Sequence, residues 1–173
     1  SAIHSAWPAI CSDLMEQFVS RMEKKAKDLG DLPPIQINWD PDLVQGKSNT
    51  GFDVIFQADQ VNKLRFAFDS ARFNSFYWGI CGREQDSDAN RSKQIHSIME
   101  AAFGVAKDNQ WWHWWAYAGE NDDFGPQFRH WEISAEPWVA IKEQEIESQF
   151  FEIIINVRTA FKERMELLKA PSP

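Results

Sequence analysis

Cysteine is scarce in this sequence of 173 residues, where it occurs only as Cys11 and Cys81, far apart along the chain. A disulfide framework needs several paired cysteines and a zinc ribbon needs C-x-x-C pairs, so the sequence predicts neither. Free cysteines are typical of a reducing compartment. We therefore expect a cytoplasmic protein.

Long apolar runs and a secretion signal are also missing. No uninterrupted apolar stretch approaches the roughly 20 residues that a transmembrane helix needs. The chain begins directly with a helical pattern, without the charged and apolar regions of a signal peptide. We expect no membrane contact, whether the chain is a mature cytosolic protein or an excised piece of a longer one.

Basic residues are outnumbered, because 18 Lys and Arg stand against 26 Asp and Glu, for a formal net charge of -8. Binding to a nucleic-acid backbone requires Lys and Arg that neutralise its phosphates, so direct nucleic-acid binding is not expected. A protein partner with a basic surface fits this charge better, although moderate acidity also serves solubility.

Known cofactor and catalytic motifs are incomplete. Residues 46–48 read Gly-Lys-Ser, as in a P-loop, but Pro41 occupies the first-glycine position and a strand is expected to follow. Residues 86–90 begin like a calcium loop, but Arg91 stands where that loop needs glycine. They predict instead an acidic start for a helix near Asn90. Neither G-x-S-x-G nor H-E-x-x-H occurs, so we predict no catalytic residue, cofactor or metal site from motifs.

Aromatic residues are abundant, with nine Trp and thirteen Phe but only two Tyr. In residues 35–81 apolar side chains recur at every second position in four runs, separated by short polar turns. The buried positions predicted from these runs are Ile35, Ile37, Trp39, Phe52, Val54, Phe56, Leu64, Phe66, Phe68, Phe76, Trp78 and Ile80. This pattern predicts an antiparallel meander of four to five strands.

Helical periodicity flanks the predicted sheet. One helix is predicted over residues 5–29 with Ser5 as its cap, one near Asn90, and one from Ser134 to the end of the chain. The last helix contains no glycine, so it either projects toward a partner or changes direction near residues 142–145. We predict a single α+β domain of residues 1–173, with the N-terminal, middle and C-terminal helices packed on one face of the sheet.

The most unusual segment is the run Trp111, Trp112, His113, Trp114 and Trp115. Strand alternation would place Trp112 and Trp114 on one face, and the other three residues on the opposite face. An exposed run of this kind could form a stacking platform for a sugar, a base or a cationic ligand. The alternative is a strand buried on both sides, because protein cores readily accommodate Trp.

Aromatic and glycine residues follow one another in a characteristic order, with a helix containing Trp7-Pro8, a Gly51-Phe52 strand, an L-x-F-x-F strand from Leu64, a strand ending Gly79-Ile80, the Trp-rich run, and a helix starting Pro137-Trp138. This order resembles the C-terminal half of bacterial proteins grouped with the PD-(D/E)xK nuclease superfamily. The resemblance spans most of the chain.

The catalytic motif of that superfamily is absent. Those nucleases need an acidic residue followed by D/E-x-K, because carboxylates hold a divalent metal and the lysine assists the attacking water. Pro41 and Asp42 supply a Pro-Asp, but no such triplet follows, and the one at residues 23–25 precedes it. The resemblance therefore implies a non-catalytic half or a standalone relative. We predict a non-enzymatic protein-interaction or accessory domain of a nuclease-like or phage-defence system.

A metal-dependent nuclease with an atypical acidic site is the alternative of a different class. Asp40 and Asp42 flank the end of the first predicted strand, and Asp53 lies on the second. The three carboxylates could therefore converge on a divalent cation.

Overall fold

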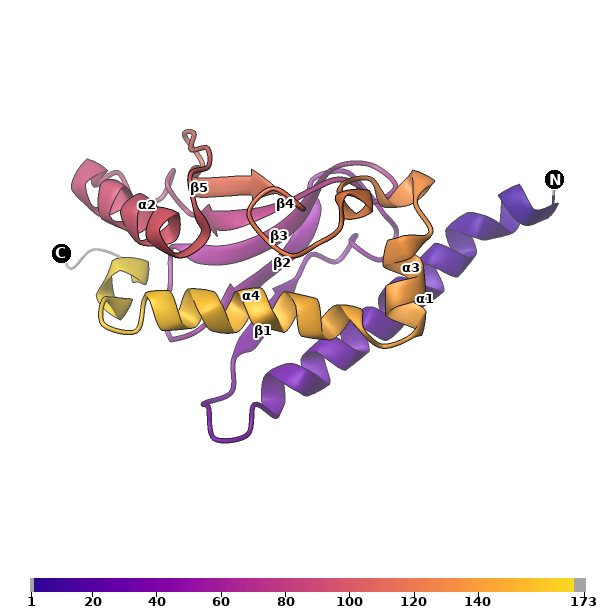
Figure 1. The fold of residues 1–173 in the computed structure, drawn as a ribbon, viewed down its shortest axis with the longest axis horizontal. Helices are drawn as coiled ribbons and strands as arrows, with labels where there is room; N and C mark the ends of the chain where they lie inside the picture. Colours follow the sequence, from indigo (N-terminus) through magenta and orange to yellow (C-terminus); the bar gives the residue numbers. More distant parts are fainter. Residues whose placement is uncertain (1, 170–173) are drawn as a thin grey trace.

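The computed structural model describes residues 2–169 as an α+β fold, in which helices pack on a five-stranded antiparallel sheet (Figure 1). The strands pair strictly in chain order, so the sheet is a meander and the predicted fold class is confirmed. The ends of the predicted domain, residue 1 and residues 170–173, lie outside the described residues.

The strands are β1 (Gln36–Trp39), β2 (Thr50–Ile55), β3 (Lys63–Ser70), β4 (Asn74–Cys81) and β5 (Trp112–Tyr117). The helices are α1 (Ala2–Lys27), α2 (Ala89–Phe103), α3 (Glu136–Lys142) and α4 (Ile146–Ala160), with short 3-10 turns η1 (Pro126–Arg129), η2 (Trp131–Ile133) and η3 (Met165–Leu168). Within residues 2–169, none of these helices combines the length and the apolar content needed to cross a bilayer.

The core lies between the sheet and the helices and is largely aromatic. Alternate strand residues face the helices, and ten of the twelve predicted positions are buried, whereas Trp39 and Phe56 are partly buried against the same core. Phe150 of α4 is at the centre of this core. Its ring centroid lies between 4.9 and 5.7 Å from those of Phe18, Phe52, Phe66, Phe76 and Phe124.

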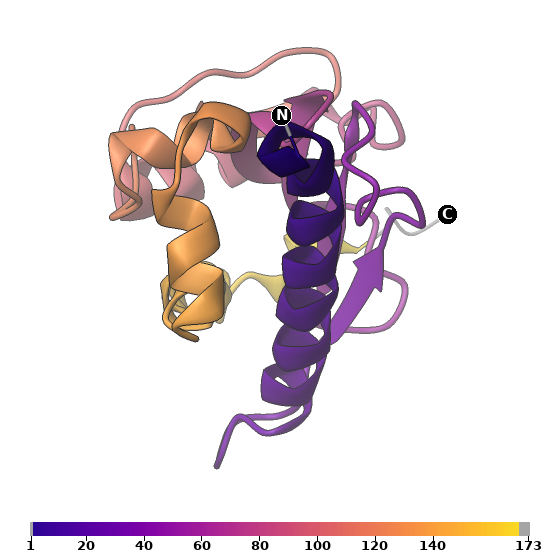
Figure 2. The ribbon, with the colours of Figure 1, turned by 90° about the vertical axis from the view of Figure 1, so that its right-hand side faces the viewer.

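Helix α1 is longer at its N-terminus than the sequence predicts. It begins at Ala2, before Ser5, so the predicted Ser5 cap is wrong. Figure 2 shows α1 beside β1 on one side and the α3–α4 segment on the other, while Figure 1 shows its first turns extending past the sheet. The buried side of α1 runs through Cys11, Met15, Phe18 and Met22, and Ile10 lies beside it and is 44% exposed.

The predicted C-terminal helix is two helices, with the change of direction at the predicted place. Gln144 adopts a left-handed conformation with φ of 61°. The Gln144 N–H donates to Ile141 O at 3.1 Å and the Glu145 N–H donates to Ala140 O at 2.9 Å. These two bonds form a Schellman motif, which ends α3 without the usual glycine. The expected start at Ser134 is also wrong, because α3 begins at Glu136 and α4 then packs along the sheet (Figure 1).

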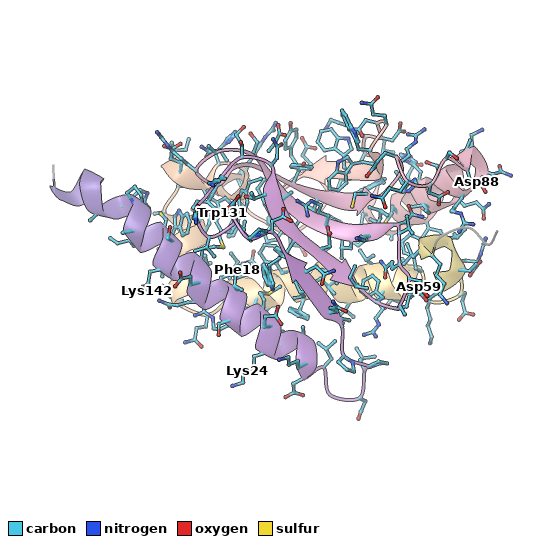
Figure 3. The ribbon with its side chains drawn as sticks, turned by 180° about the vertical axis from the view of Figure 1, so that it is seen from behind. Phe18, Lys24, Asp59, Asp88, Trp131 and Lys142 are labelled. Carbon is cyan, nitrogen blue, oxygen red and sulfur yellow. The ribbon has the colours of Figure 1, made fainter. Side chains whose placement is uncertain are left out.

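None of the helices in the described part of the chain, residues 2–169, covers the opposite face of the sheet. In Figure 3, seen from behind, the strands lie in front of α4, whereas α4 lies in front of them in Figure 1. Small residues lie along the middle of this outer face, at Gly51, Ala67 and Gly79. A Cβ added at Gly79 would lie 2.0 Å from Trp114 O, so β4 and β5 can approach in this way only with glycine there.

Candidate functional site

The outer face of the sheet brings the two predicted sites onto one surface. Asp53 is opposite Arg65, Arg65 is opposite Gly79, and Gly79 is opposite Trp115 in the strand register. Arg65 and Trp115 are thus separated by two strand spacings, or about 10 Å. An ion-pair network lies toward β1 and an aromatic surface lies toward β5.

Arg65 organises the acidic end of this face. Its guanidinium donates to Asp40 Oδ2 and to Asp53 Oδ1, the latter at 3.1 Å. Burial disfavours the charged guanidinium, but hydrogen bonding and the charges of both carboxylates outweigh this effect and raise the pKa of Arg65. Lys63 is a second basic partner of Asp53, because its Nζ lies 4.0 Å from Asp53 Oδ2. Basic groups of the chain itself therefore compensate both carboxylates.

Asp42 does not join the other two predicted acids. Its carboxylate lies 3.5 Å from Lys47 Nζ, in the loop between β1 and β2. Among residues 2–169, no group of three or more His, Cys, Asp or Glu side chains is placed to hold a metal ion. The structure thus joins Asp40 and Asp53 through Arg65 and leaves Asp42 in a separate, exposed pair.

A β-bulge rearranges the Trp-rich run. Ile80 pairs with Trp114 while Cys81 pairs with Trp112, so His113 is an extra residue in β5. Trp112 and Trp115 consequently share the outer face, and His113 and Trp114 both turn toward the helices. The predicted alternation is wrong here because one inserted residue changes the side to which every earlier residue points.

His113 and Trp114 are fully buried, so neither forms part of an exposed binding surface. The His113 ring bonds through Nδ1 to Ser92 Oγ at 2.8 Å and through Nε2 to Asn62 Oδ1 at 2.6 Å. Asn62 in turn donates to Asp86 Oδ2 at 2.9 Å. Burial is the main cause that lowers the pKa of His113 to about 4. The imidazole is therefore neutral near pH 7 and acts as an internal link between β5 and α2.

The other three Trp residues belong to a partly exposed aromatic cluster on the outer face, which we call the aromatic patch and define as Tyr77, Trp111, Trp112, Trp115 and Tyr117. Tyr77 lies at its centre, and its ring meets Trp112 and Trp115 edge-on at centroid distances of 5.1 and 5.7 Å. Trp111 is 52% exposed. Burial, followed by the charge of Asp69, raises the pKa of Tyr77 to about 12, so its hydroxyl remains protonated at neutral pH.

The aromatic patch encloses a small pocket. With Asp69 and Asn109 it surrounds a space of about 190 Å³. Asn109 Oδ1 accepts hydrogen bonds from the Trp111 and Trp112 N–H groups at 2.9 and 3.0 Å, which orders this corner. The sequence pattern alone does not identify Tyr77, Tyr117 or Asp69 as site residues. One signal was present for Tyr77. It alternates in the sequence with the apolar residues of β4 that are predicted to be buried, so it could have been assigned to the outer face of the sheet.

Two cations of the chain already stack on the aromatic patch. Arg129 Cζ lies 3.8 Å from the centre of the Tyr117 ring, and Lys107 Nζ lies 4.8 Å from that of Trp115. Glu120 pairs with both cations, at 3.3 Å for Lys107 and 3.9 Å for Arg129. The electron-rich ring faces of the patch are thus suited to cationic groups.

A second, larger cavity of about 580 Å³ lies between α1, η2 and α3. Its lining includes the rings of Trp7, Phe73 and Trp138, together with Ile133, which is 82% exposed. Cys11 also lines it, but burial raises the pKa of this thiol to about 11. The thiol is therefore protonated at neutral pH and is a poor nucleophile.

Burial likewise raises the pKa of Cys81 on β4 to about 12, which argues against a thiolate on the outer face.

No family model, curated protein or solved structure matches this chain. The resemblance to the PD-(D/E)xK nuclease superfamily therefore stays a prediction.

Proposed function

We propose that the chain is a non-enzymatic protein-binding module whose binding surface is the outer face of the sheet. The observation that carries this proposal is the aromatic patch, which lies on a sheet face without a covering helix and leaves Trp111 52% exposed. Trp and Tyr are enriched at the energetic centres of protein interfaces, because they bury large areas at small entropic cost. Apolar side chains that gather at a protein surface are accordingly a marker of an interaction site.

The size of the pocket favours a protein over a small molecule as the ligand. Its volume of about 190 Å³ is below the roughly 300–1,000 Å³ of typical small-molecule sites. A sugar or a nucleotide would have much of its surface left in solvent. A single side chain projecting from a partner protein could be enclosed, with the surrounding sheet supplying the rest of the contact.

The charge of the chain indicates which kind of partner surface is favoured. The net charge of -8 attracts a basic surface and repels nucleic-acid phosphates. The compensation of Asp40 and Asp53 by Arg65 supports a structural role for these carboxylates. Through the resemblance of its sequence pattern, we extend the proposal to an accessory role in a nuclease-like or phage-defence system.

Affinity purification followed by binding measurements tests the proposed surface. We expect a partner retained by the wild-type chain to bind the Trp111→Ala variant about tenfold more weakly, because truncating an interface Trp typically removes more than 1 kcal/mol. The matched control is Ile133→Ala, which truncates another exposed apolar residue, in η2. Both variants should keep the wild-type circular dichroism spectrum.

Two results would contradict the proposal. Equal weakening by Trp111→Ala and Ile133→Ala would show that the aromatic patch is not the binding surface. Cleavage of plasmid DNA in magnesium or manganese, abolished by Asp53→Ala, would instead support the metal-dependent nuclease.

A further inference from the structure

Asp69 introduces an uncompensated negative charge at the pocket of the aromatic patch. Lys107 and Arg129 pair with Glu120, and Arg65 pairs with Asp40 and Asp53. Within residues 2–169, the exposed carboxylate of Asp69 makes no hydrogen bond or ion pair. The pocket therefore combines aromatic walls with one carboxylate that is available to an incoming cation.

The chain's own Arg129 and Lys107, which already stack on the aromatic patch, indicate which type of cationic side chain suits these rings. The guanidinium of Arg129 lies 3.8 Å from the Tyr117 ring centre, closer than the ammonium of Lys107, which is 5.3 Å from the same centre. A planar guanidinium stacks on an aromatic ring and can still donate two parallel hydrogen bonds to a carboxylate. An ammonium is a compact and strongly hydrated charge, so it gains less from this combination.

We propose that the pocket of the aromatic patch receives an arginine side chain of the partner protein, stacked on the rings and paired with Asp69. This inference rests on the proposed function and specifies the chemistry of its partner. The small volume of about 190 Å³ suits one extended side chain, and the remaining exposed surface of Trp111 covers its apolar stem.

Nuclear magnetic resonance titrations of the indole N–H signals test this inference directly. The probe is a short blocked peptide of glycine and serine with one central arginine; matched peptides carry citrulline or lysine at that position. We expect the arginine peptide to bind with a dissociation constant in the millimolar range and to shift the signals of Trp111, Trp112 and Trp115. Citrulline, which keeps the shape but loses the charge, should cause no saturable shift, and lysine should bind several-fold more weakly.

Asp69→Asn tests the role of the carboxylate. We expect it to weaken binding of the arginine peptide by about fivefold, the effect of losing one partly exposed ion pair. The matched control is Asp31→Asn, which removes the same charge at an exposed turn after α1 and should leave the affinity unchanged. Indole signals are assigned with single Trp→Phe variants.

Each alternative result overturns the inference. No saturable shift with arginine, equal binding of citrulline or lysine, or equal weakening by Asp31→Asn would exclude an arginine pocket. A partner that needs Trp111 but is insensitive to Asp69→Asn would also exclude it, while the proposed function would stand.

Discussion

At the residue scale, His113 shows how a residue can be prominent in the sequence and yet have an internal role. Its hydrogen-bond partners Asn62 and Ser92 lie far from it in the sequence, on the loop before β3 and on α2. No local pattern could therefore reveal that both ring nitrogens are engaged. Because the imidazole is fully buried, its contribution depends on its remaining neutral.

This burial predicts a pH-dependent stability. Unfolded His113 binds a proton below its ordinary pKa of 6.5, whereas the folded protein binds one there only below about 4. Its stabilising contribution is thus complete above pH 6.5 and is lost as pH falls toward 4, a change on the order of 3 kcal/mol in the free energy of unfolding. Urea unfolding measured at a series of pH values checks this.

A His113→Gln variant separates this effect from that of the carboxylates. The variant should lack the part of the pH dependence between pH 6.5 and 4 that is due to His113, while His130→Gln at an exposed histidine should retain it. The same slope in His113→Gln and wild type would mean that other groups cause the pH dependence.

At the scale of elements, sequence patterns predicted the strands better than their irregularities. Period-two alternation identified β1 to β4 because large apolar residues occupy every second position there, whereas the positions between them hold small or polar residues or Tyr77. The bulge in β5 escaped prediction, since a run of aromatic residues gives no polar positions from which to read the register. The end of α3 was predicted only as one of two alternatives, the other being a continuous projecting helix. The reason is that Gln144 occupies the left-handed position where glycine is the usual signal.

Replacing Gln144 by glycine should therefore stabilise the protein. A side chain in the left-handed region costs roughly 1–2 kcal/mol, part of which glycine loses again through its greater freedom in the unfolded chain. We expect Gln144→Gly to raise the free energy of unfolding by about 1 kcal/mol. Chemical denaturation measures this change.

The neighbouring Glu143 provides the control for this substitution. Its φ of -83° is available to every residue, so Glu143→Gly should lower the free energy of unfolding. Destabilisation by both substitutions would show that the left-handed conformation at Gln144 is not strained.

At the scale of the whole molecule, the sheet separates a structural face from a candidate binding face. The inner face could be predicted from apolar periodicity, and so could the polar–aromatic character of the outer one. Which residues meet on the outer face could not be predicted, because Asp69, Tyr77 and Trp115 come from three strands whose relative positions depend on register and on the bulge. Of the predicted Trp cluster, the bulge places Trp112 and Trp115 on the outer face and turns the buried His113 and Trp114 toward the helices.

The central position of Phe150 predicts that the helices and the sheet unfold together. Its ring contacts α1, β2, β3 and β4 as well as the loop before η1, through Phe18, Phe52, Phe66, Phe76 and Phe124. Replacing a buried Phe by Ala costs about 3–5 kcal/mol, a large part of the roughly 5–15 kcal/mol that stabilises a typical domain. We expect Phe150→Ala to lower the urea midpoint strongly, with coincident transitions by far-ultraviolet circular dichroism and tryptophan fluorescence.

The control for this substitution is Val105→Ala, at a 78% exposed residue, which should change the free energy of unfolding by less than about 0.5 kcal/mol. If instead fluorescence changed at a lower urea concentration than circular dichroism, the core around Phe150 would be a separate unit, and the chain would not unfold as one domain.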